Sequence, residues 1–179
     1  MDLIRRLGYE RRQQPFQLSS GEWSHDYIDG KRALASGESL KHVAEAVIQE
    51  AARAGVSFDA IGGPTMGADP TAHAVAVLTG TKWFSVRSKA KAHGKQKLIE
   101  GAELKPGMKV LLVEDVVTTG KSILDALDAV AGTGVEVVLA LAIVDRGESA
   151  RKLFEEKGVE YRALSTYEDF DIEPVAAGR

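Results

Sequence analysis

The sequence predicts one α/β domain in which helices flank a mostly parallel sheet of about five strands. Two patterns carry this prediction. Apolar segments of strand length alternate along the chain with segments whose apolar residues recur at helical spacing. The segment at residues 110–113 is apolar throughout, which is typical of a strand buried on both faces of a parallel sheet. A length of 179 residues and a hydrophobic content of 44% are sufficient for one domain with a full core.

The N-terminal part is expected to form a small hood beside this sheet. Residues 2–8 have the apolar spacing of a short helix, and residues 16–34 hold two alternating runs around a Ser-Ser-Gly turn, which predicts a strand pair. Residues 39–54 carry apolar side chains along one helical face, and Gly55 ends that helix. We therefore assign a single domain, 1–179, with an N-terminal hood and helices at 1–55 and an α/β core at 56–165.

The core is predicted to alternate strands with helices. Strands are expected at residues 58–62, 82–86, 110–113, 135–144 and 159–164, and helices at 71–78, 122–131 and 149–157. No repeat and no linker interrupts this alternation, so the core is expected to be one continuous unit.

Composition excludes several classes of function. The net charge of −3 offers no basic surface for nucleic acid, and no apolar run approaches the length of a membrane span. The chain has no cysteine, which excludes a disulfide framework and a thiolate nucleophile or metal site. Its first residues lack an apolar segment of signal-peptide length. We therefore expect a cytoplasmic protein with no nucleic-acid or membrane partner.

Residues 110–122 predict a phosphate site. The apolar run stops at two adjacent carboxylates, Glu114 and Asp115, and a Thr-Thr-Gly loop then leads into a helical pattern from Ser122. In open α/β sheets such a loop binds ligands, and the N–H groups of the loop and helix favour a phosphate. Two acids beside it indicate Mg²⁺ or the hydroxyls of a ribose. The alternative is an ordinary strand–loop–helix unit with solvated acids. A Walker A loop is excluded, because that pattern needs glycine where Asp115 stands.

A cationic segment precedes this motif by about one strand–helix unit. Residues 87–97 contain five cations and a histidine, with Gly94 among them. Such a run is usually only a solvated face. Because this one directly follows a predicted strand, it is interpreted as a mobile cationic lid over a polyphosphate.

The motif at 110–122 resembles the 13-residue phosphoribosyl-pyrophosphate (PRPP) motif of the type I phosphoribosyltransferases. Within that family the chain is most similar to the orotate phosphoribosyltransferases of the bacterial stand-alone form. Three further segments carry this likeness: Phe16-Gln17-Leu18-Ser19-Ser20-Gly21 with Ser24 and Tyr27-Ile28-Asp29, then Arg87 with Lys91 and His93-Gly94, and finally Asp145-Arg146. The arginine of the last pair would hold the orotate carboxylate, because a guanidinium fork suits a planar carboxylate.

The resemblance implies transfer of the 5-phosphoribosyl group from PRPP to orotate, in a homodimer whose mobile loop, 87–97, acts in trans. Catalytic roles fall on Arg87, Lys91, His93 and Asp115. PRPP-binding roles fall on Glu114, Asp115, Val116, Val117, Thr118, Thr119, Gly120, Lys121, Ser122, Arg87, Lys91 and His93. Orotate-binding roles fall on Tyr27, Ile28, Thr118 and Arg146. Mg²⁺ is the expected cofactor, bound mainly through PRPP and through water near the two acids, with no direct protein ligand.

The chain departs from the family pattern at three places. Ser19 and Ser88 stand where the family often has lysine, and a lysine near Gly67 is absent. Ser88 removes a cation from the loop predicted to act in catalysis. Two alternatives therefore stay open: a phosphoribosyltransferase for another nucleobase, and a non-catalytic paralogue that senses PRPP.

Overall fold

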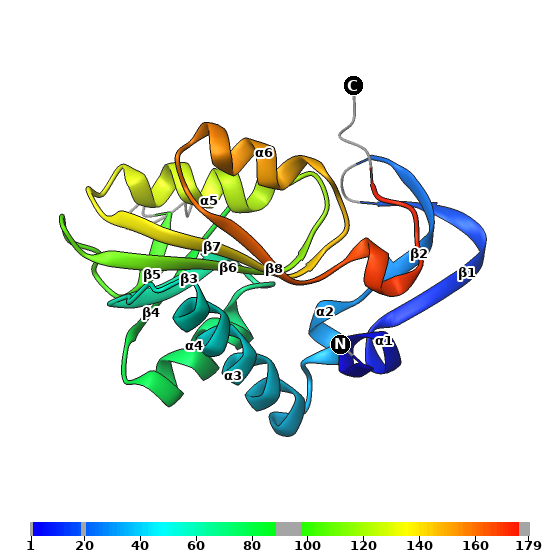
Figure 1. The fold of residues 1–179 in the computed structure, drawn as a ribbon, viewed down its shortest axis with the longest axis horizontal. Helices are drawn as coiled ribbons and strands as arrows, with labels where there is room; N and C mark the ends of the chain where they lie inside the picture. Colours follow the sequence, from blue (N-terminus) through cyan, green and yellow to red (C-terminus); the bar gives the residue numbers. More distant parts are fainter. Residues whose placement is uncertain (1, 19–20, 89–97, 176–179) are drawn as a thin grey trace, which may run out of the picture.

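A computed structural model describes residues 2–18, 21–88 and 98–175 of the chain (Figure 1). The helices are α1 (Asp2–Leu7), α2 (Gly30–Ala33), α3 (Gly37–Arg53), α4 (Asp69–Thr79), α5 (Lys121–Ala131), α6 (Ser149–Glu156) and the 3₁₀ helix η1 (Tyr167–Phe170). The strands are β1 (Tyr9–Gln17), β2 (Trp23–Ile28), β3 (Ala60–Pro64), β4 (Lys82–Val86), β5 (Ile99–Gly101), β6 (Lys109–Val117), β7 (Glu136–Asp145) and β8 (Tyr161–Thr166). Within these ranges no helix is both long and apolar enough to cross a membrane.

The central sheet has the strand order β5-β4-β3-β6-β7-β8. Its strands β4, β3, β6, β7 and β8 are parallel, and β5 pairs antiparallel with β4 at one edge. The predicted α/β class and the five parallel strands are confirmed. The short strand β5 was not predicted, because its three residues directly follow the cationic segment that was interpreted as a lid.

Helices cover both faces of the sheet, α3 and α4 on one side and α5 and α6 on the other (Figure 1). The apolar run in β6 explains this burial. Leu111 and Val113 join the core under α3 and α4, whereas Val110 and Leu112 join the core under α5 and α6. Successive side chains of a strand point to opposite faces of the sheet. A strand whose residues are all apolar is therefore expected to be covered on both faces.

The N-terminal hairpin lies beyond the end of the sheet, with α1, α2 and η1 around it (Figure 1). Strands β1 and β2 are antiparallel, and Phe16 pairs with Ser24. This confirms the predicted strand pair, although β1 begins at Tyr9, earlier than expected. A shift in register between Arg11 and Phe16 separates its two paired stretches, which conceals the full strand from a search for simple alternation.

Strand β6 does not stop at the two acids, and that expectation was wrong. It continues to Val117, which pairs with Asp145 of β7. On the other edge, pairing with β3 ends at Leu112. The acids therefore belong to a strand that stays hydrogen-bonded on the β7 side only. Backbone pairing overrides the polar side chains here, because a strand needs only its main-chain groups to continue a ladder.

Candidate active site

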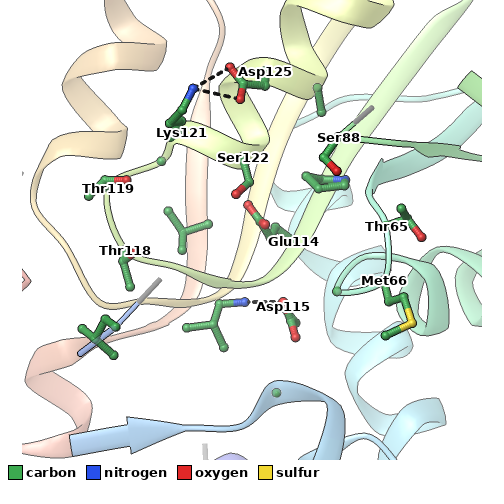
Figure 2. A pocket seen from close by; sticks show the side chains of 18 of the residues that line it. Thr65, Met66, Ser88, Glu114, Asp115, Thr118, Thr119, Lys121, Ser122 and Asp125 are labelled. Carbon is green, nitrogen blue, oxygen red and sulfur yellow. Dashed lines mark hydrogen bonds and ion pairs between the residues drawn. The ribbon is translucent and has the colours of Figure 1, made fainter. Parts of the chain in front are cut away.

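A cavity of about 640 Å³ lies where the hairpin meets the carboxyl end of β6 (Figure 2). Its lining brings together most of the predicted site residues that the structure describes: Tyr27, Ile28, Arg87, Glu114, Asp115, Val116, Val117, Thr118, Thr119, Gly120, Lys121, Ser122 and Arg146. It also includes Phe16, from the N-terminal segment that carries the family likeness, and residues to which no site role was given, among them Gly30, Lys31, Thr65, Met66 and Gly67. Lys91 and His93 lie outside the described residues, as does Ser19.

The loop that leads from β6 into α5 is shaped by two glycines. Gly120 adopts a φ of 82°, a left-handed conformation that favours glycine, and it directly precedes α5. Gly147 lies against the Thr118 carbonyl so closely that a Cβ on it would overlap that oxygen. The hydroxyls of Thr118, Thr119 and Ser122 thereby stand around the start of an 11-residue helix, which is the arrangement expected for a phosphate site (Figure 2).

The two acids of the motif are nearly buried, with 9% of Glu114 and 7% of Asp115 exposed. Burial, reinforced by the neighbouring Asp115 and opposed by Lys31, raises the pKa of Glu114 to about 8. Glu114 is therefore largely protonated at neutral pH in the ligand-free protein. Asp115 is held differently: its Oδ1 accepts a hydrogen bond from the Val116 N–H at 2.9 Å, and Lys31 Nζ lies 3.7 Å from its Oδ2.

Arg146 lies at the end of β7 and joins the sheet to the hairpin. Its side chain is only 2% exposed; Nη1 donates to the Asp26 carbonyl at 2.8 Å and Nη2 to Ser24 Oγ at 3.3 Å. Nε is buried and has no hydrogen-bond partner among the described residues. Burial also lowers the pKa of Arg146, with Asp26 opposing this. One edge of the guanidinium, Nε with the weakly bonded Nη2, is thus the part that can take another acceptor.

The neighbouring Asp145 has a structural role. Its Oδ1 accepts from the Gly147 N–H at 3.0 Å and its Oδ2 from the Tyr161 hydroxyl at 2.9 Å. Burial raises the pKa of Asp145. These bonds fix the turn after β7 from which Arg146 extends.

The loop after β3 forms another wall of the cavity and is fastened by Asp69. The carboxylate of Asp69 accepts from Thr65 Oγ1 and from Ser85 Oγ, each at 2.6 Å. Gly67, in the same loop, lies directly against the Asp115 carboxylate: a Cβ added to Gly67 would overlap Asp115 Oδ1. The close approach of this loop to β6 therefore favours glycine at position 67, because a side chain there would displace the loop or the Asp115 carboxylate.

Sequence reasoning missed Lys31 and the glycines beside Asp115. Lys31 lies within the segment 16–34 that was predicted as a strand pair, whereas the structure places it in helix α2; no spacing pattern relates it to an acid on the central strand. Only the folding of the hairpin over the end of the sheet brings them together.

Residues 31–167 match the family model for the phosphoribosyl transferase domain. The chain belongs to the phosphoribosyltransferase family. Among relatives of this phosphoribosyltransferase, the orotate phosphoribosyltransferase of Pyrococcus abyssi is 40% identical over 154 residues, 86% of this chain and 84% of the relative. The orotate phosphoribosyltransferase of Mycobacterium tuberculosis is 40% identical over 177 residues, 96% of this chain and 94% of the relative.

Solved structures agree with this family assignment. The crystal structure of Mycobacterium tuberculosis orotate phosphoribosyltransferase with Fe(III) dicitrate matches with a TM-score of 0.80 and 37% identity, covering 96% of both chains. The same enzyme in complex with PRPP matches with a TM-score of 0.77 and 35% identity, again covering 96% of both chains. The phosphoribosyltransferase described here thus shares its architecture with these enzymes over nearly its full length.

The chemistry of the acid pair fits Mg²⁺ held jointly with a substrate. Within the described ranges, no group of three or more His, Cys, Asp or Glu could hold a metal ion by itself. Mg²⁺ in phosphate-transfer sites is commonly bound through one or two carboxylates together with substrate phosphates and water. Asp115 and, once deprotonated, Glu114 lie at the cavity wall, where they would interact with Mg²⁺ through its bound water while the substrate phosphates hold the ion.

Proposed function

We propose that the protein transfers the 5-phosphoribosyl group from PRPP to orotate, giving orotidine 5′-monophosphate and pyrophosphate, in the de novo synthesis of UMP. One observation carries the proposal: the same cavity is lined by the 114–122 motif and by Arg146. The first suits a ribose phosphate and the second a planar carboxylate. The relatives that cover most of the chain are orotate phosphoribosyltransferases, which supports the same reaction.

In this proposal the 5′-phosphate of PRPP lies in the loop before α5. Backbone N–H groups of residues 117–122 and the hydroxyls of Thr118, Thr119 and Ser122 would hold it. Glu114 and Asp115 would accept hydrogen bonds from the ribose hydroxyls. Arg87 would contact the pyrophosphate, which its Nε supports, since that atom is buried without a hydrogen-bond partner among the described residues. The catalytic and PRPP-binding roles of Lys91 and His93, which lie outside the described residues, stay predictions.

Mg²⁺ would be held by the pyrophosphate and by water near the acid pair, and it would neutralise charge on the departing group. The remaining stabilisation of the transition state would come from side chains of the protein. C1 of the ribose becomes positively charged as the pyrophosphate leaves, and the carboxylates of β6 favour that charge. Cations of the loop stabilise the departing pyrophosphate, while N1 of orotate approaches C1. No covalent intermediate with the protein is required.

Orotate would lie beside Tyr27 and Ile28, with its carboxylate on the Nε and Nη2 edge of Arg146. Arg146 is nearly buried in the ligand-free structure, and its bond to Ser24 is the longer of its two bonds to the hairpin. Orotate would replace that bond when it enters. Entry of the base therefore requires the Ser24 hydroxyl to move away from Nη2, while the bond from Nη1 to the Asp26 carbonyl can stay.

We also expect a cytoplasmic homodimer in which the 87–97 loop acts on the partner's site. Arg87 lines the cavity of its own subunit, so the action in trans falls on the residues that follow it in this loop. An exposed apolar patch supports an interface: Val77 is 83% exposed, and Leu78 and Trp83 are also exposed. The patch lies on α4 and β4, and His73, one turn before Val77, packs edge-on against Trp83 with ring centroids 4.4 Å apart. Because β4 leads directly to Arg87, an interface here would bring the loop close to a second subunit.

The proposal is tested by following the loss of orotate absorbance when PRPP and Mg²⁺ are added to the purified protein. Uracil, adenine and hypoxanthine serve as competing bases, and a reaction without metal is the control. Metal-dependent consumption of orotate alone is the expected result. Turnover of another base in its place would contradict the assignment of Arg146, and binding of PRPP without any turnover would indicate a sensor.

A further inference from the structure

Lys31 is a cation inside the cavity to which the proposed reaction gives no role. It belongs to α2, directly after the hairpin, and lines the same cavity as the acid pair. Its Nζ lies 3.7 Å from Asp115 Oδ2. Within residues 2–18, 21–88 and 98–175, no other ion pair reaches either acid of β6.

Asp115 is enclosed on both sides by glycines. An added Cβ on Gly30 would lie 2.8 Å from Asp115 Oδ2, and one on Gly67 would overlap Oδ1. Oδ1 also accepts from the Val116 N–H. One carboxylate oxygen is thus fixed by the backbone of β6 and the loop after β3, while the other faces Gly30 and Lys31. This carboxylate has its orientation set by three separate segments of the chain.

Because of the charges around it, the ion pair of Lys31 with Asp115 is expected to affect substrate binding more than an ordinary surface ion pair would. Exposed pairs contribute little, and 54% of the Lys31 side chain is exposed. Its partner, however, is nearly buried beside a second nearly buried carboxyl group, Glu114. Lys31 is the cation beside these two acids, so removing it leaves Asp115 next to Glu114 without a neighbouring opposite charge among the described residues. The Oδ2 side of the carboxylate would then lose the contact that orients it, and the site would repel the anionic substrate more strongly.

We propose that Lys31 is a positioning residue for the ribose site, holding Asp115 in the orientation that accepts the ribose hydroxyls. The inference rests on the proposed function, since it concerns how the same cavity recognises PRPP. It also gives α2 a role: this helix directly follows the hairpin, and through Lys31 it contacts the acid that is proposed to bind the ribose. Recognition of the ribose and placement of the hood are thereby coupled through one side chain.

The inference predicts a specific kinetic pattern for Lys31→Met. The two substrates that contain ribose, PRPP and orotidine 5′-monophosphate, should show a KM raised by about tenfold, which corresponds to the loss of one oriented charged contact. The two that lack ribose, orotate and pyrophosphate, should keep their KM within about twofold. Lys31→Arg should restore the values, because the guanidinium keeps the charge at that place.

Lys41→Met is the matched control. Lys41 forms an ion pair with Glu45 at 3.8 Å, nearly the same distance, on the exposed face of α3 and away from the cavity. Its kinetics should equal those of the wild-type protein. Thermal melting of all three variants separates loss of fold from loss of positioning, since Lys31→Met should melt within a few degrees of wild type.

Calorimetric titration with PRPP and with pyrophosphate, both with Mg²⁺, needs no turnover and separates the two proposals. Weaker PRPP binding and unchanged pyrophosphate binding by Lys31→Met support the inference. Equal loss for both ligands, or no loss for either, overturns it. A wild-type protein that binds PRPP but leaves orotate unchanged refutes the proposed function, and the same titrations still decide the role of Lys31.

Discussion

At the scale of the residue, the site contains ionisable groups whose burial costs free energy and whose hydrogen-bonding capacity is only partly satisfied by the protein. Glu114 has a raised pKa, Arg146 a lowered one, and the Nε of Arg146 lacks a hydrogen-bond partner within the described residues. A folded chain keeps such groups when a ligand completes them. A substrate that brings hydroxyls to Glu114 and a carboxylate to Arg146 satisfies both.

The raised pKa of Glu114 predicts how the ligand-free protein responds to pH. Burial raises this pKa from 4.5 to about 8, so between these values the folded protein holds a proton that the unfolded chain releases. Stability should therefore fall as the pH rises from about 5 to 8. The loss in Tm is expected to be on the order of 10 °C.

Differential scanning calorimetry of Glu114→Gln checks this prediction, because glutamine cannot ionise. The variant should melt higher than wild type at pH 8 and show a flatter dependence on pH. Glu45→Gln, at an exposed position on α3, is the control and should keep the wild-type slope. An unchanged slope in Glu114→Gln would show that another group is responsible.

Gly67→Ala tests the close contact between the loop after β3 and Asp115. An added methyl overlaps Asp115 Oδ1, so the loop or the acid must move. We expect kcat/KM for PRPP to fall by roughly tenfold or more. Gly37→Ala is the control: nothing lies within 4 Å of its added Cβ, at the first position of α3, and activity should not change. Wild-type activity in Gly67→Ala would mean that the contact is not needed for binding.

At the scale of the element, the site depends on how loops are fastened to strands. Asp69, at the start of α4, ties the loop after β3 to β4 through Thr65 and Ser85. The loop lines the cavity on the side of Arg87, where the pyrophosphate is proposed to lie. Its geometry is therefore set by one carboxylate with two short bonds.

Asp69→Ala should loosen this loop and raise the KM for PRPP by about tenfold, through the loss of two hydrogen bonds to a charged acceptor. Steady-state kinetics with PRPP and with orotate measure the effect, and the KM for orotate should change little. Asp69→Asn keeps a group that can accept from one hydroxyl and donate to the other, so it should retain most of the affinity. Equal damage in both variants would assign the effect to charge instead of position.

The elements themselves followed from the sequence, whereas their contacts did not. The apolar run at 110–113 and the helical spacing at 39–54 identify β6 and α3 because burial imposes those periods. The end of β6 was misjudged because main-chain pairing with β7 continues under polar side chains. Strand β5 was missed because three residues carry too little pattern. The contact of Lys31 with Asp115 joins distant parts of the chain, and no local pattern encodes it.

At the scale of the whole molecule, the cavity lies where the hairpin, the β3 loop and the β6 loop meet. The lining of the cavity is thus shared among segments that lie between Phe16 and Arg146 in the chain. The exposed patch on α4 and β4 extends this arrangement to a second subunit in the proposed dimer.

Val77→Glu tests that interface. A carboxylate at this exposed position should oppose association and convert the dimer to a monomer, which light scattering detects. If the loop acts in trans, activity should fall by at least about 100-fold. Gln49→Glu, which adds the same charge on the exposed side of α3, should leave both properties unchanged. A fully active monomer would show that the loop acts within its own subunit.

The most direct test of the account is the preference for orotate over uracil, measured as the ratio of kcat/KM values for wild type and for Arg146→Gln. Uracil lacks only the carboxylate, so the wild-type ratio should exceed roughly 100, and the variant should lose most of it through failure on orotate. A variant that keeps the wild-type preference would show that the carboxylate is recognised elsewhere and would contradict the central role given to Arg146.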